Sequence, residues 1–151
     1  MQRPRLSGDR VDSRWWYWIA AVPTVFAFWM VTVAWVAIAI SLEPGLLDSG
    51  LGNDPLTQAA RISLVAVGVP FVVLTAIFPF AVFQDTQAID RASVEWEPPS
   101  STYAAIALFG LLVLAVAGVS DVSVGVISGL VASVPFALYY LQQRHERLGV
   151  P

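Results

Sequence analysis

The stretch that decides the fold is Trp15–Leu42, WWYWIAAVPTVFAFWMVTVAWVAIAISL, in which no residue carries a charge. It is longer than the roughly 20 apolar residues that an α-helix needs to cross the hydrocarbon core of a bilayer. Its first four residues are all Trp or Tyr, and such rings concentrate at the headgroup boundary. This stretch therefore predicts a first transmembrane helix that begins at a membrane surface.

Further uncharged stretches follow the first one along the chain. One lies between Arg61 and Asp85, and the interval from Thr102 to Gln143 is long enough for two spans with a tight turn near Asp121. We predict an all-α integral membrane bundle of four transmembrane helices. The predicted spans are about 15–42, 62–84, 102–120 and 122–143.

The predicted domain organisation is one transmembrane domain with two short tails. Residues 1–14 form an Arg-rich N-terminal tail, residues 15–143 form the four-helix domain, and residues 144–151 form the C-terminal tail. A loop at 43–60, rich in Pro, Gly and acidic residues, joins the first two spans. Either Asp54 or Thr57 is expected to cap the second helix there, because short polar side chains satisfy free N–H groups at a helix start.

The distribution of arginine predicts the orientation in the membrane. The chain has eight cationic residues, and every one is Arg. All of them except Arg61 lie in the two tails or in the loop between the second and third predicted spans. Cytoplasmic segments of membrane proteins collect cations. We therefore predict a multi-pass protein of the cell membrane with both termini in the cytoplasm.

The composition restricts the chemistry that this chain can perform. There is no cysteine, and His145 is the one histidine, which excludes disulfides, thiolate metal sites and His-based metal clusters. The predicted spans contain no ionisable side chain, whereas proton relays and ion carriers keep one at depth. A Gly-rich phosphate loop and a Ser–His–Asp arrangement are both missing. We expect no catalytic residue, no metal, no cofactor and no nucleic-acid partner.

The charged residues suggest a salt-rich habitat. Acidic residues outnumber basic ones by 11 to 8 and the net charge is −3, although membrane proteins usually carry basic cytoplasmic loops. Concentrated salt screens the repulsion between carboxylates, which in turn hold water and cations. An acidic surface without lysine is therefore typical of a halophile. A GC-rich genome that favours Arg codons would produce part of the same pattern.

Small residues recur every four positions in the fourth predicted span: Gly125, Gly129, Ser133 and Ala137. Small side chains let two helix backbones approach closely inside a membrane. The stripe is therefore a helix-packing surface, either for a second copy or for the third span of the same hairpin. The third span carries small residues on a compatible face, namely Ala107, Gly110 and Ala117, and we favour packing within the hairpin.

Polar residues at the predicted cytoplasmic face form a candidate interaction cluster: Asp85, Asp90, Glu95, Arg144 and His145. Grouped carboxylates hold divalent cations or transfer protons in other proteins. A hydrated acidic loop is the simpler interpretation, and we favour it for these acids. Pairing of Arg144 or His145 with one of the two aspartates would tie the two halves of the chain together.

Two parts of the chain resemble a known group of proteins. The first part runs through Phe83-Gln84-Asp85, Ile89-Asp90, Trp96-Glu97-Pro98 and Tyr103, and the second is the ending Ala137–Pro151. Together they resemble a haloarchaeal family of small multi-pass membrane proteins, which end in Tyr-Tyr-Leu, two polar residues, Arg-His and Gly-x-Pro. The family has no assigned function, so the resemblance implies lineage alone. Its members often have an Asn-Pro-like break near the last hairpin, where this chain has Asp121 and no proline.

These observations together favour a non-enzymatic accessory, assembly or structural membrane subunit. Its expected partners are the lipid bilayer and either another membrane subunit or a second copy. The alternative is a small oligomeric transporter or channel, which the prolines of the second and fourth spans favour because they kink the helices. A membrane enzyme that uses Asp85, Asp90 and Glu95 is a third, less favoured hypothesis.

Overall fold

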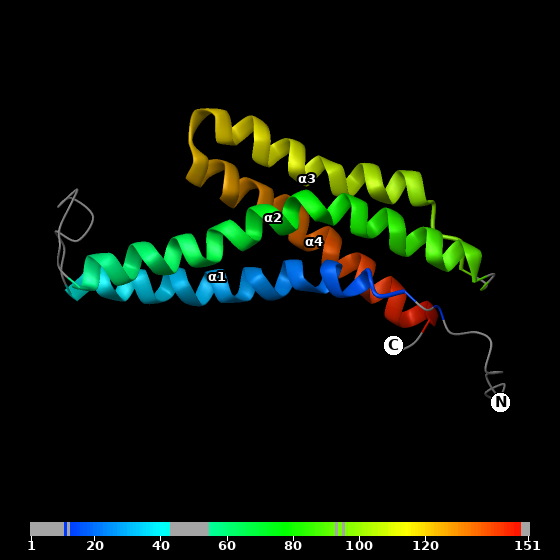
Figure 1. The fold of residues 1–151 in the computed structure, drawn as a ribbon, viewed down its shortest axis with the longest axis horizontal. Helices are drawn as coiled ribbons and strands as arrows, with labels where there is room; N and C mark the ends of the chain where they lie inside the picture. Colours follow the sequence, from blue (N-terminus) through cyan, green and yellow to red (C-terminus); the bar gives the residue numbers. More distant parts are fainter. Residues whose placement is uncertain (1–10, 12, 43–54, 93, 95, 149–151) are drawn as a thin grey trace.

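A computed structural model describes residues 11, 13–42, 55–92, 94 and 96–148 of the chain. These residues form four helices and no strand: α1 (Trp16–Leu42), α2 (Pro55–Arg91), α3 (Ser100–Ser120) and α4 (Val122–Leu148). Each helix is long and apolar enough to cross a membrane. The structure therefore confirms the all-α fold with four candidate spans, as expected for a multi-pass membrane protein (Figure 1).

Two helices extend beyond the predicted spans. α2 begins at Pro55, inside the predicted loop, and continues past Asp85 to Arg91. Proline suits the first helical turn because the N–H group that it lacks would have no partner there. α4 continues to Leu148, through residues predicted as a tail. Charged residues end a hydrophobic span, but Arg and Glu are good helix formers and do not end the helix itself.

Of the two residues predicted to cap α2, Thr57 does not do so. Thr57 lies within the first turns of the helix, because α2 already begins at Pro55. The other candidate, Asp54, lies outside the described residues. Thr57 is buried, so this side chain belongs to the packed face of α2.

The helices form two antiparallel hairpins, α1 with α2 and α3 with α4 (Figure 1). The start of α1, the end of α2, the start of α3 and the end of α4 lie together, and we call this the terminal end. We call the opposite end of the bundle, where α3 turns into α4, the far end. Asp121 forms that turn in an extended conformation, and its side chain accepts a hydrogen bond from Val124 N–H at 3.1 Å. This carboxylate caps the start of α4.

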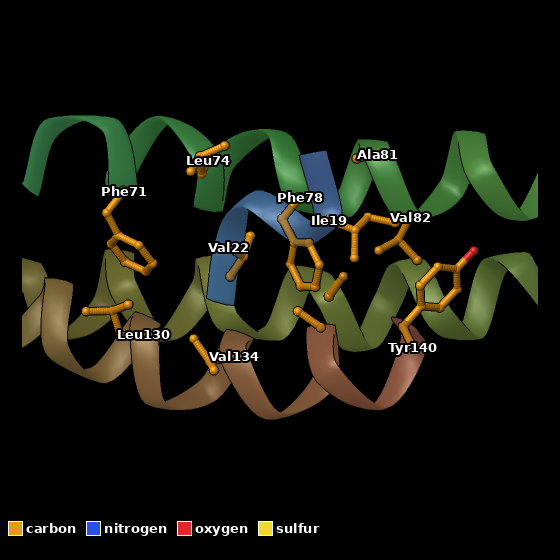
Figure 2. Close-up of a cluster of buried hydrophobic side chains, with 12 residues drawn as sticks. Ile19, Val22, Phe71, Leu74, Phe78, Ala81, Val82, Leu130, Val134 and Tyr140 are labelled. Carbon is orange, nitrogen blue, oxygen red and sulfur yellow. The ribbon is translucent and has the colours of Figure 1, made fainter. Parts of the chain in front are cut away.

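The hydrophobic core is concentrated in the terminal half of the bundle. There α1, α2 and α4 contribute the side chains that Figure 2 shows, and α3 adds Ala107. The far half has a smaller cluster formed by α1 and α2 alone, with Val36, Ala39 and Ala60 at its centre. The members of the larger cluster are Ile19, Val22, Phe71, Leu74, Phe78, Ala81, Val82, Ala107, Leu130, Val134, Ala137 and Tyr140.

The small residues of α4 pack against α3. A Cβ atom added to Gly125 would lie 2.6 Å from the Cα of Gly118, and one added to Gly129 would lie 2.8 Å from the Cβ of Leu114. A Cβ on Gly110 would collide with the Oγ of Ser133. The stripe therefore lies inside this hairpin, where close backbone approach permits dispersion contacts and weak Cα–H···O contacts.

Replacing Gly125 by Ala should destabilise the protein, whereas Gly68→Ala should not. At Gly125 the added methyl group meets backbone atoms, which cannot move aside without shifting the helix, and such overpacking costs about 1–3 kcal/mol. At Gly68 nothing lies within 4 Å of the added atom. Thermal unfolding in mild detergent measures both changes. Equal midpoints for the two variants would contradict the packing of α4 on α3.

Candidate functional site

The main polar feature among the described residues is a buried cluster around Asp85, at the terminal end of the bundle. Asp85 lies on α2 and is fully buried. Its Oδ2 atom accepts hydrogen bonds from the Tyr140 hydroxyl at 2.8 Å and from the Arg144 Nε at 3.0 Å. Its Oδ1 atom accepts a short hydrogen bond from the Ser13 hydroxyl. We call these four residues the Asp85 cluster.

Helical periodicity explains why these side chains meet. Phe78, Val82 and Asp85 are all buried and follow one another on α2 at intervals of four and three residues. Residues at these intervals lie on one face of a helix, so Asp85 continues the buried face of α2. Tyr140 and Arg144 are four residues apart on α4, so they lie on the same face of that helix. The Ser13 hydroxyl also accepts a hydrogen bond from Trp15 N–H at 3.3 Å. The segment before α1 is thereby fixed against α2.

Aromatic rings surround the cluster. The Trp16 ring lies under the Arg144 guanidinium, with 5.6 Å from Cζ to the ring centroid, which is a favourable cation–π distance. The Tyr140 ring contacts Tyr103 at 5.8 Å and Trp96 at 6.2 Å between centroids. These rings shield the ion pair from water, since Arg144 is 4% exposed. The low polarity of this surrounding strengthens every hydrogen bond to Asp85.

The energetics of the Asp85 cluster depend on both charges being present. Removing a carboxylate and a guanidinium from water is costly, and their attraction offsets this cost when the geometry is good and further hydrogen bonds are made. Asp85 meets that requirement, because its charge is shared by three donors. Loss of either partner would leave an uncompensated buried charge, which typically costs about 3–5 kcal/mol.

The cluster lies at the edge of the span. The uncharged part of α2 extends from Arg61 to Asp85, and at 1.5 Å per residue this corresponds to about 36 Å. The hydrocarbon core of a bilayer is roughly 30 Å thick. If Arg61 lies at one surface, Asp85 therefore reaches the opposite surface. The ion pair therefore lies at the end of the uncharged part of α2, which extends away from it.

The structure brings together two of the five residues of the candidate interaction cluster. Arg144 and Asp85 form an ion pair that joins α4 to α2. Asp90 and His145 are exposed, and Glu95 lies outside the described residues. Asp85 is therefore not part of a hydrated surface, because α2 continues beyond it and turns it toward α4. No group of three His, Cys, Asp or Glu side chains in the described part of the chain is placed to hold a metal ion.

Two members of the Asp85 cluster, Tyr140 and Ser13, are not among the residues that the sequence pointed to. Tyr140 had a usable signal, since it lies one helical turn before Arg144 and shares its face. No sequence pattern connects Ser13 to the cluster, because this residue is 72 positions from Asp85 and lies outside the predicted spans. All four residues of the helix-packing stripe are in α4, and Ala137 is fully buried in the core beside Tyr140.

Comparisons with known proteins give no relative for this chain. No protein-family model matches it. Searches of curated proteins and of solved structures likewise return no match.

Replacing Asp85 by Asn should lower the stability by about 3–5 kcal/mol, because Arg144 would remain buried without a counter-charge. Asp90→Asn is the matched control and should change the stability by less than about 0.5 kcal/mol, since Asp90 is exposed. Thermal unfolding in detergent, at low and at multimolar salt, measures both. The loss should persist in salt because buried pairs are screened little. A loss that disappears in salt would mean that water reaches the pair.

Proposed function

We propose that this protein is a non-enzymatic accessory, assembly or structural subunit of the cell membrane. The observation that carries the proposal is the Asp85 cluster, in which the buried carboxylate makes hydrogen bonds to three donors of the same chain. A catalytic carboxylate needs a free oxygen that faces substrate. Asp85 instead joins α2, α4 and the segment before α1, which is an architectural role.

The outward face of α1 supports a partner within the membrane. α1 packs on α2 and α4, and much of the rest of its surface is exposed. Ala27, Ala34 and Ser41 are exposed on this face at intervals of seven residues, between larger side chains at Thr24, Val31 and Ile38. Apolar and small residues at this period fit the packing of another apolar transmembrane helix in a left-handed arrangement. This geometry suits a second subunit or a second copy.

Purification in mild detergent tests the proposal. We expect a stoichiometric second polypeptide or a homo-oligomer in the wild type, detected by native mass spectrometry. Ala34→Trp should remove the association because a large ring prevents close approach of two helices. Val116→Trp is the control, since Val116 is also exposed, on α3. A wild-type monomer without any bound polypeptide, under conditions that retain lipid, would refute the subunit role.

The orientation is also a proposal, with both termini in the cytoplasm. Its support is the arginine distribution, in which Arg61 alone lies on the predicted outer side. The four helices make an even number of candidate crossings, so the two ends of the described chain lie on one side of a bilayer that they span. The lineage proposal, a haloarchaeal membrane protein, has its support in the lysine-free acidic composition and in the resemblance at residues 80–151.

Single cysteines test the orientation cleanly, because the natural chain contains none. Gln58→Cys near the start of α2 should react with a membrane-impermeant maleimide in intact cells. His145→Cys near the end of α4 should react after the membrane is permeabilised. Both positions are exposed in the bundle, so differences in labelling report the side of the membrane. The opposite pattern would place both termini outside.

A further inference from the structure

The two hairpins contact each other along the terminal half of the bundle. The core cluster that combines residues of all four helices runs from Phe71 to Val82 on α2 and from Leu130 to Tyr140 on α4. Nearer the far end, the described core consists of α1 and α2 residues alone. α1 and α3 make no close backbone contact within the described chain. The two hairpins therefore contact each other mainly in the terminal half of the bundle.

Each hairpin, in contrast, is packed along its length. In α3 and α4 the backbones approach closely at Gly118 and Gly125, near their turn. In α1 and α2 the indole N–H of Trp35 donates a hydrogen bond to the Ser63 hydroxyl at 3.4 Å, within the far-end cluster. Contacts between sequence neighbours form early and at low entropic cost. Each hairpin is thus packed as a unit of its own.

An apolar groove opens where the hairpins separate. Its volume is about 350 Å³, and one side is formed by Val72 of α2. Figure 1 shows α3 and α4 diverging from α1 and α2 toward the far end. We call this groove the fork. The other side consists of α3 and α4 residues: Leu114, Ala115, Gly118, Val119, Val122 and Val126.

The balance of forces differs between the fork and the Asp85 cluster. In a bilayer, lipid tails solvate apolar side chains about as well as another helix does, so apolar contact alone binds helices weakly. Lipid tails cannot solvate a carboxylate or a guanidinium. Separation at the fork exchanges apolar contacts for lipid contacts, whereas separation at the terminal end would break the ion pair and the hydrogen bond from Tyr140 that offset the burial of Asp85. These polar contacts therefore contribute most of the free energy that opposes separation of the two hairpins.

We propose that the Asp85 cluster is a clasp that holds the two hairpins together at the terminal end, so that breaking it lets them move apart as rigid bodies and widens the fork. The clasp lies where Tyr140 and Arg144 of one hairpin bind Asp85 of the other. Ser13 locks the start of the first hairpin to the same carboxylate. Lipid tails enter the widened fork, because its walls are apolar.

Distance measurements between pairs of spin labels test this device in lipid nanodiscs. The fork pair is Val65→Cys on α2 with Val119→Cys on α3, both exposed. The hairpin pair, Val116→Cys on α3 with Val131→Cys on α4, is the internal control, again at exposed positions. Each pair is measured with Asp85 intact, with Asp85→Asn, and with Tyr140→Phe. Tyr140→Phe removes one hydrogen bond but keeps the ion pair, so it serves if Asp85→Asn fails to fold.

With the clasp intact, both distance distributions should be narrow. In the clasp variants the fork distance should broaden or lengthen by about 5 Å or more, the pitch of one helical turn, while the hairpin pair stays unchanged. An unchanged fork distance in both variants would overturn the clasp. Broadening of the hairpin pair to the same extent would overturn the rigid-body movement of the hairpins. Neither result depends on whether the protein has a partner subunit.

Discussion

The ion pair between Asp85 and Arg144 is the interaction on which the arrangement of the bundle depends. Both side chains are buried, so each depends on the other to offset the loss of its hydration. This requirement fixes the rotation of α2 and α4 about their axes, because each helix must turn one chosen face inward. Tyr140 and Ser13 then use the same carboxylate, which extends the constraint to the start of α1.

Packing inside the α3–α4 hairpin follows a different physical rule. Apolar surface gains little from leaving lipid, so the hairpin depends on backbone proximity, and Gly118 and Gly125 provide it. The Ser133 hydroxyl is buried against Gly110 and makes no hydrogen bond within the described chain. The Ser133 Oγ lies where a Cβ atom on residue 110 would be, so glycine at this position leaves room for the hydroxyl. Dispersion between close backbones therefore stabilises the packing of α4 on α3, whereas the ion pair stabilises the contact between the two hairpins.

The sequence predicted the number and type of the spans because hydropathy over some 20 residues depends on composition alone. It predicted less about the site, since that depends on which residues face each other. The charge of Asp85 was interpreted as the start of a hydrated loop, although Phe78 and Asp85 are seven residues apart and share a helix face if α2 continues. The contribution of Ser13 required the tertiary structure, because nothing local connects it to α2.

The same physics bears on how a partner would recognise this protein. The hydroxyls on the membrane-facing side of α1 are already satisfied: Thr24 donates to the Ala20 carbonyl and Thr32 to the Phe28 carbonyl. A helix that packs there would find no free hydroxyl donor at these two positions, so shape would contribute more to the match, and shape-driven association in lipid is weak per contact. The proposed partner would be selected by shape, whereas the two hairpins share a buried charge pair. The buried polar contacts of this chain therefore hold its own hairpins together.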